Sequence, residues 1–144
     1  NITYPTWDIS QLKKMYIDDV EYAPKRTHKF SSTGTHTVRL IFNDTFNTMG
    51  MMFATCSNLV SADFTKCDLS NVTIMGGAFG DCTSLTSVNL QSFNTQSVTT
   101  MENMFQNMGY NSTNFSIICF SSFSVSSNAS SYFSIMLLSD KSTL

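Results

Sequence analysis

A tandem repeat is the feature that most constrains the fold of this chain. The segment Phe53-Ala-Thr-Cys-Ser-Asn-Leu59 is matched by Phe79-Gly-Asp-Cys-Thr-Ser-Leu85, and the interval from Phe53 to Phe79 is the repeat length. Phe105 follows Phe79 at the same interval. A unit of this length cannot bury its apolar face alone and does so by stacking on its neighbours. The repeat therefore predicts a solenoid in which matched residues form columns.

Two apolar spacings within a unit predict its elements. Val88 and Leu90 alternate as a β-strand requires, whereas Val98, Met101 and Phe105 recur every three to four residues, as in a helical or 3-10 turn. We therefore expect a leucine-rich-repeat-like solenoid. Each coil would contain one short parallel β-strand and a short helical or 3-10 return.

The repeat changes register after Met108. The segment 109–114 has the composition of a loop and predicts an insertion of about four residues. In this alignment Ile118 takes the place of Val88 in a degenerate last coil. A strand over residues 132–138 would close the C-terminal edge.

Residues 1–37 lack the repeat and predict a β-rich cap. The segment 15–22 indicates two short strands around an Asp18-Asp19 turn, and the segment 28–42 indicates a second hairpin with Gly34 at its turn. Terminal segments of this kind cover the exposed strand edges of a repeat array. The aromatic residues expected to cover the first coil are Trp7, Tyr16 and Phe30. The chain then divides into a β-hairpin N-terminal cap, 1–37, and a solenoid of about three coils plus a C-terminal cap, 38–144.

Composition excludes several classes of function. The charged fraction is 12% and the net charge is −2, and no basic stripe of the kind that binds nucleic acid is present. No apolar run approaches the length of about 20 residues that a membrane span needs, so membrane insertion is not expected. The chain begins at Asn1 without Met or an apolar leader. We expect a secreted, processed chain, with a fragment as the alternative.

The repeat also resembles a known family. Met52-Phe53 with Cys56 and Leu59, then Phe93-Asn-Thr-Gln-Ser-Val-Thr-Thr-Met101 and Met104-Phe105, is similar to the BspA-like leucine-rich repeat of bacterial and protist surface proteins. The resemblance covers about residues 46–125. It implies a right-handed leucine-rich-repeat solenoid, a cell-surface or secreted location, and adhesion to host proteins or other cells. It implies no catalytic residues. The chain departs from the family pattern at Cys67 and at Gly76-Gly77-Ala78.

The four cysteines leave two possibilities open. Cys56 and Cys82 occupy the same column, and adjacent strands lie about 4.8 Å apart, within the range of about 4.4 to 6.8 Å for bridged Cα atoms. A Cys56–Cys82 disulfide is therefore possible, although parallel Cβ directions make its torsion awkward. The alternative is free thiols lining the core, with Cys67 as a small buried residue and Cys119 exposed.

Six Asn-x-Ser/Thr sequons offer candidate glycosylation sites, about twice the number expected by chance. The candidates are Asn1, Asn43, Asn71, Asn111, Asn114 and Asn128. The alternative is that Asn and Thr side chains form ladders between coils.

Catalytic and metal chemistry find little support in the sequence. A zinc site needs paired Cys or His residues at short spacing, and neither His28 nor His36 is close to a cysteine in the sequence. The acidic cluster at Asp18, Asp19 and Glu21 lacks the regular spacing of a calcium loop and is better explained as a solvated turn. No Gly-x-Ser-x-Gly elbow is present, and Gly76-Gly77 is too short to cradle a phosphate. We therefore expect a protein that is not an enzyme and needs no cofactor.

The outward strand positions form a small, flat and nearly uncharged face that suits contact with a protein or glycan. Its predicted members are Ser61, Asp63, Thr65, Ser87, Asn89 and Gln91, followed by Ile117, Cys119 and Ser121 of the last coil. Two functions follow. The first is a structural protein that associates with itself head to tail in an extracellular filament or matrix. The second is an adhesin or binding module that uses the strand face.

Overall fold

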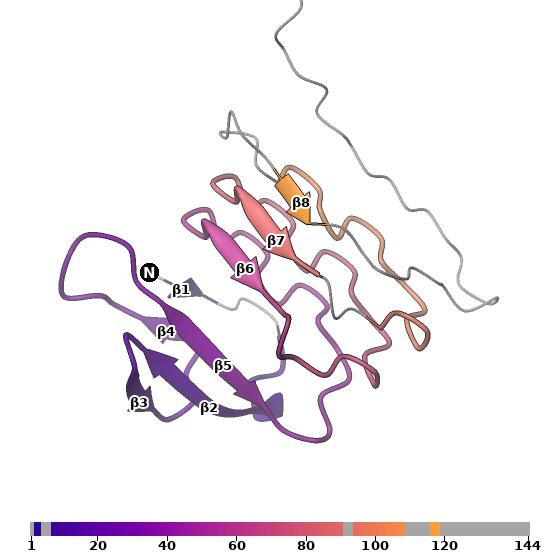
Figure 1. Ribbon diagram of the computed structural model, residues 1–144, viewed down its shortest axis with the longest axis horizontal. Helices are drawn as coiled ribbons and strands as arrows, with labels where there is room; N and C mark the ends of the chain where they lie inside the picture. The colour runs from indigo at the N-terminus through magenta and orange to yellow at the C-terminus, as the bar shows by residue number, and fades with distance from the viewer. Residues whose placement is uncertain (1, 4–6, 91–93, 109–115, 119–144) are drawn as a thin grey trace, which may run out of the picture.

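The computed structural model describes residues 2–3, 7–90, 94–108 and 116–118, which form strands, turns and irregular connections with almost no helix. The strands are β1 Ile2–Thr3, β2 Leu12–Ile17, β3 Val20–Tyr22, β4 Thr27–His28, β5 Val38–Phe42, β6 Ser61–Asp63, β7 Ser87–Asn89 and β8 Ser116–Ile118, and one 3-10 helix, η1, spans Ile9–Gln11. They form a two-stranded pair β1-β4, an antiparallel sheet in the order β3-β2-β5, and a parallel sheet in the order β6-β7-β8. Figure 1 shows the two larger sheets side by side, with the antiparallel one at the N-terminal end.

The β2–β3 hairpin forms as the sequence predicts. Asp18 and Asp19 connect the strands with φ of 49° and 64°. Two consecutive left-handed residues make the tight turn whose twist matches that of paired strands, and Asp tolerates this region better than most residues. Leu12, Met15 and Ile17 on β2 are buried and direct this strand toward the core.

The second predicted hairpin is wrong. β4 pairs with β1, where His28 is the partner of Ile2, and β5 pairs with β2, where Val38 is the partner of Ile17. Residues 29–37 are the loop between β4 and β5. β2 still has a free edge after it pairs with β3, and β5 presents alternating half-buried residues that continue the buried face of β2. Burial against a distant strand therefore outweighs a local hairpin at Gly34.

Matched residues of the repeat lie side by side in the parallel sheet. Ser61 pairs with Ser87 and Ala62 pairs with Val88, in each case one repeat length apart. Val88 in turn pairs with Ile117, which lies three residues beyond one repeat length. The predicted register at β8 is thus wrong by one residue, because the extra length is three residues and not four. The expected insertion 109–114, Cys119, Ser121 and the closing strand 132–138 lie outside the described residues.

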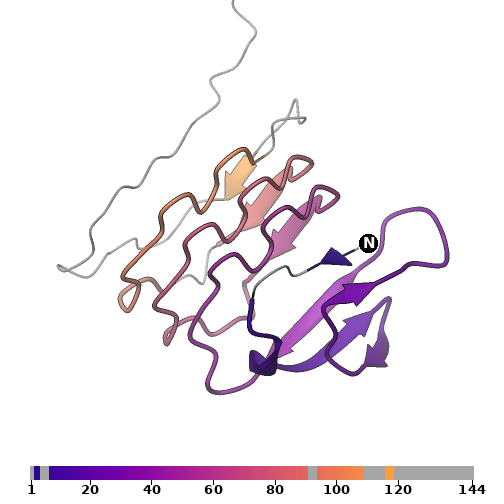
Figure 2. The same cartoon turned by 180° about the vertical axis from the view of Figure 1, so that it is seen from behind.

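The predicted fold class, a leucine-rich-repeat-like solenoid with helical or 3-10 returns, is wrong. The described residues form the pair β1-β4 and two three-stranded sheets, one antiparallel and one parallel, and their only helix is η1. The segments expected to be helical are successive β-turns instead, at residues 49–55, 75–81 and 101–107, and we call these the turn segments. Figure 2 shows them stacked on one another.

Hydrogen-bond direction explains why the turn segments are not helical. Met49 N donates to the oxygen of Ile74 at 2.8 Å, and Met75 N donates to the oxygen of Thr100 at 2.9 Å. A helical N–H would instead bond to the carbonyl four residues back in its own segment. Met51 also has a left-handed φ of 56°, which stops helix propagation. The spacing of three to four apolar residues therefore arises from turns.

Stacked apolar columns form the core between the turn segments and the parallel sheet. The Phe79 ring is parallel to those of Phe53 and Phe105, with centroids 5.4 and 5.8 Å away. Phe64 meets Phe79 edge to face at 5.9 Å. Phe79 itself is 0% exposed. Such aromatic pairs stabilise beyond the area that they bury, so this stack joins the three turn segments.

Two side chains complete the N-terminal edge of the first turn segment. Trp7 Nε1 donates to the oxygen of Thr48 at 2.7 Å, and Asn47 N donates to Oε1 of Gln11 at 3.0 Å. Between later units, backbone groups of the neighbouring unit make the corresponding hydrogen bonds. Thr99 N, for example, donates to the oxygen of Thr73, one repeat length earlier. Trp7 and Gln11 therefore replace the backbone partners that a preceding unit would supply. Trp7 acts as the sequence predicts for an aromatic cap residue.

Candidate functional site

The strand face is polar and in part exposed. Ser61 and Asp63 on β6 are exposed, whereas Ser87 and Asn89 on β7 are half-buried beside their neighbours. Asp63 Oδ1 accepts a hydrogen bond from Thr65 N at 2.9 Å. This bond lowers the pKa of the Asp63 carboxyl, so its charge is kept. Thr65 is half-buried, and Gln91 lies outside the described residues.

Several polar side chains bond along their columns and so stabilise the fold. The hydroxyls of Thr73 and Thr99 donate to backbone oxygens one repeat length, or 26 residues, earlier, at 3.3 and 3.0 Å, and Thr86 does the same at 2.9 Å. Asn107 Nδ2 donates to Asp81 Oδ1 at 2.8 Å across the same interval. These groups satisfy one another within the chain. Among these residues Thr73 belongs to a sequon, that of Asn71, so one sequon threonine takes part in a ladder between coils.

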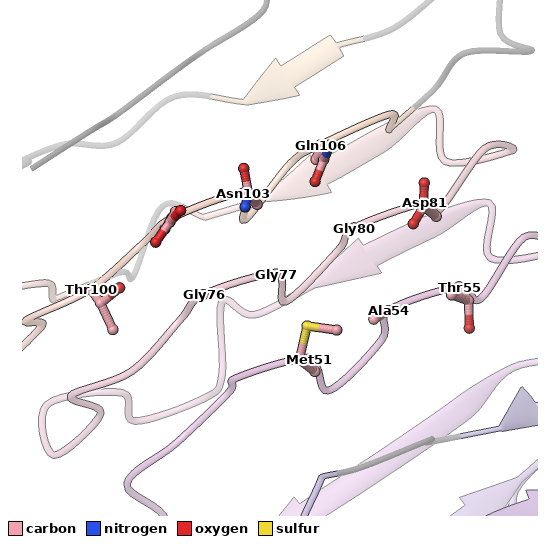
Figure 3. A pocket seen from close by; sticks show the side chains of 11 residues that line it. Met51, Ala54, Thr55, Gly76, Gly77, Gly80, Asp81, Thr100, Asn103 and Gln106 are labelled. Carbon is pink, nitrogen blue, oxygen red and sulfur yellow. The ribbon is translucent and has the colours of Figure 1, made fainter.

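A groove on the turn segments was not predicted from the sequence. It encloses about 340 Å³. The residues that line it are Met51, Ala54, Thr55, Gly76, Gly77, Gly80, Asp81, Thr100, Glu102, Asn103 and Gln106. Figure 3 shows that no side chain rises from the three glycines, while Met51 lies on one side and Asn103 and Gln106 lie on the other. The sequence did contain a signal for this groove. Gly76, Gly77 and Gly80 lie close together, whereas most of the matched positions one repeat length away carry side chains.

Two features favour glycine at the centre of the groove. Gly77 has a left-handed φ of 63°, and a Cβ on it would overlap Met51 Sδ. Backbone groups of the floor already have partners within the chain, since Gly77 N donates to the oxygen of Glu102 and Gly76 O accepts from Met51 N. The walls offer carboxylates, amides, hydroxyls and a thioether. This set can hold a polar chain by hydrogen bonds, and it contains no paired base and nucleophile.

The cysteines are free thiols wherever the structure describes them, at Cys56, Cys67 and Cys82. Cys82 Sγ donates to the oxygen of Phe53 at 3.0 Å. Burial raises the pKa of the Cys82 thiol to about 12 and that of Cys67 to about 11. Only the thiolate attacks a disulfide or binds metal, so both thiols are poorly reactive. A Cys56–Cys82 bridge on oxidation stays a prediction.

The two sequons within the described residues differ in accessibility. Asn71 is exposed beside a turn. Asn43 is half-buried, and its Nδ2, the atom that would carry a glycan, donates to the oxygen of Ser10 at 2.8 Å. Asn71 is therefore better suited to modification than Asn43. The candidates Asn1, Asn111, Asn114 and Asn128 lie outside the described residues.

The part of the chain that the structure describes contains no group of three His, Cys, Asp or Glu side chains arranged to hold a metal ion. His36 bonds to Asp18 at the β2–β3 turn, and His28 lies on β4 against Tyr22 and Phe30. Within the same ranges, no helix has the length and apolar character needed to cross a bilayer.

Comparison with protein families places the repeat in a wider group. Residues 25–136 match a family described as Mycoplasma protein of unknown function, DUF285. The chain belongs to this family. The DUF285 match covers β4, β5 and every described strand and turn segment that follows them. No curated protein and no solved structure matches the chain.

Proposed function

We propose that this DUF285 chain is a non-enzymatic binding module of an extracellular or cell-surface protein, which holds a protein or glycan through flat polar surfaces. The observation that carries the proposal is the parallel sheet, whose outward residues Ser61, Asp63, Ser87 and Asn89 are small, polar and accessible. Small hydroxyl and amide groups on a rigid sheet contact another surface at little cost in side-chain entropy.

The N-terminal edge favours binding over head-to-tail association. Trp7 and Gln11 already occupy the backbone groups of Thr48 and Asn47 that a second chain would need to pair with. An end that is covered in this way cannot add another unit without displacing those side chains. The surface location and the adhesive role rest on the similarity of the repeats to BspA-like sequences, and both stay predictions.

Binding is tested by screening the intact chain against arrays of saccharides and of immobilised matrix proteins, with three variants of the chain. Ser87→Arg places a long charged side chain on the strand face, and Gly76→Leu fills the groove. Ser31→Arg makes the same change of charge in the exposed loop before β5 and is the control. We expect Ser87→Arg to weaken binding of a retained partner about tenfold or more, as substitutions at the centre of an interface do.

The outcomes of this screen distinguish the two surfaces. If Gly76→Leu abolished binding and Ser87→Arg did not, the partner would bind in the groove and not on the strand face. Equal loss with Ser31→Arg would show non-specific charge effects. No binding to any arrayed protein or saccharide would contradict the proposal.

Self-association is a second candidate, because charge is unevenly distributed along the chain. Residues 1–39 carry six Lys and Arg against four Asp and Glu, whereas residues 40–108 carry one against five. Opposite net charge at two ends favours head-to-tail contact that weakens with salt. Sedimentation velocity at rising protein concentration, at about 20 mM and about 500 mM salt, tests it. A single monomeric species at high concentration and low salt would rule out the filament.

A further inference from the structure

We propose that His36 is a pH-dependent latch, which in its protonated form holds the loop of residues 29–37 onto the β2–β3 turn. This inference is independent of the proposed binding function. In Figure 1 the loop between β4 and β5 extends from the antiparallel sheet. His36 lies at the end of that loop, just before β5, and its side chain is only 16% exposed.

The hydrogen-bond partners of His36 require both ring nitrogens to be donors. Nδ1 is 2.7 Å from Asp18 Oδ2, and Nε2 is 3.2 Å from the oxygen of Ser32. A carboxylate and a carbonyl can only accept. A neutral imidazole has one N–H and can satisfy one of these partners, whereas an imidazolium satisfies both. The geometry therefore fits the charged ring.

Further contacts of Asp18 and of the His36 ring hold the loop at both ends. Asp18 Oδ1 accepts from Thr37 N at 2.9 Å, and Asp18 N donates to the oxygen of Thr37 at 2.9 Å. The Phe30 ring, at the start of the loop, stacks on the His36 ring with centroids 4.2 Å apart and planes 11° apart. A charged ring over an aromatic face is further stabilised by the ring quadrupole. Loss of the proton therefore weakens the contacts to Asp18, to Phe30 and to Ser32 together.

The other ionisable groups near His36 do not replace its role. From β4, His28 meets Phe30 edge to face at 4.9 Å, and its Nδ1 is buried with no hydrogen-bond partner among the described residues. Burial lowers the pKa of His28, and Lys25 lowers it further. Lys25 lies over the Tyr22 ring at 4.4 Å. His28 is therefore neutral where His36 is charged.

Two more charges on the elements packed against the loop form a separate pair. Arg39 on β5 lies 3.7 Å from Asp19 and faces the Tyr16 ring. Neither group is a partner of the His36 ring in the contacts that the structure shows.

The direction of the pKa shifts sets the pH window of the latch. The bond to Asp18, and then that to Ser32, raises the pKa of His36 above its ordinary 6.5. A raised pKa in the folded chain stabilises the latch fully below the pKa of the unfolded histidine, and this stabilisation is lost as pH rises through the folded pKa. The bonds from His36 and Thr37 lower the pKa of Asp18 below 3.8. The carboxylate therefore becomes protonated, and stops accepting these bonds, only in stronger acid. The latch therefore holds in mild acid and opens toward alkaline pH.

The experiment is a titration of the intact chain by NMR, in which the two histidines of the sequence give separate ring signals. We expect His36 to titrate above the value of an unfolded peptide and His28 to titrate below it. Asp18→Asn should return His36 toward the unfolded value. Asn tolerates the left-handed φ of 49° at position 18 as well as Asp does, so this variant should fold.

Loop opening is measured separately by hydrogen exchange of residues 29–37. After correction for the intrinsic effect of pH, we expect Thr37 N–H to lose about tenfold of its protection as pH rises through the His36 titration. His36→Gln should abolish this pH dependence, whereas His28→Phe should keep it and is the matched control. A His36 that titrates at or below the peptide value, or loop protection that is equal on both sides of the titration, would overturn the proposal.

Discussion

Phe79→Ala should lower the free energy of unfolding by about 3–5 kcal/mol, the usual cost of removing a fully buried aromatic ring. Phe79 is 0% exposed and lies between the parallel rings of Phe53 and Phe105. Its removal leaves a cavity where the turn segments meet and breaks two ring stacks at once. Urea denaturation followed by the fluorescence of the single tryptophan, Trp7, measures the change.

Phe53→Ala is the matched control for this variant. Phe53 belongs to the same column but is only half-buried at its end, so its loss should cost clearly less, about 1–3 kcal/mol. Phe79→Leu keeps most of the apolar volume and should cost clearly less than Phe79→Ala. If Phe79→Ala proved no more destabilising than Phe53→Ala, the column would not be the centre of the core.

Trp7→Ala should destabilise the chain by a similar amount, about 3–5 kcal/mol, since Trp7 is 2% exposed. Its ring meets Phe42 and Phe46 edge to face, with centroids 5.9 and 6.1 Å away. The loss would also leave the oxygen of Thr48 without the indole N–H. Far-UV circular dichroism during thermal unfolding measures this variant, because the fluorescence probe is gone.

Trp7→Phe separates packing from hydrogen bonding at this edge. Phenylalanine keeps most of the aromatic contact but cannot donate to Thr48, so about 1–3 kcal/mol should be lost through the unpaired carbonyl alone. Gln11→Met makes the corresponding change at the partner of Asn47 N. Two variants with stability equal to that of the natural chain would show that water, and not these side chains, satisfies the edge.

The sequence predicted some local features well and others poorly. The Asp18-Asp19 turn was predictable because it depends on two adjacent residues that accept positive φ. The hairpin at Gly34 was not, because β5 had a better partner in β2. The register at β8 was wrong by one residue, since an insertion inferred from apolar spacing cannot distinguish three residues from four.

The strand face was predictable for the residues on β6 and β7, because outward positions follow from period-two alternation. The groove was not, although its glycines were visible. Gly76, Gly77 and Gly80 form its floor only because neighbouring turn segments place side chains such as Met51 and Asn103 on either side of them. The pairing of His36 with Asp18 likewise joins residues 18 apart.

The sequence by itself determined which residues meet across the repeat, because one repeat length carries Ser61 to Ser87 and Phe53 to Phe79. Only the tertiary structure decided the backbone conformation of the segments between these matched contacts. Apolar residues spaced by three to four suit a helix and a series of β-turns equally well. The choice depends on whether backbone N–H groups bond within their own segment or to the next one. Here the N–H groups alternate. Met49 N bonds to the oxygen of Ile74 in the next segment, whereas Met52 N bonds three residues back to the oxygen of Met49. Turns therefore replace the expected helices.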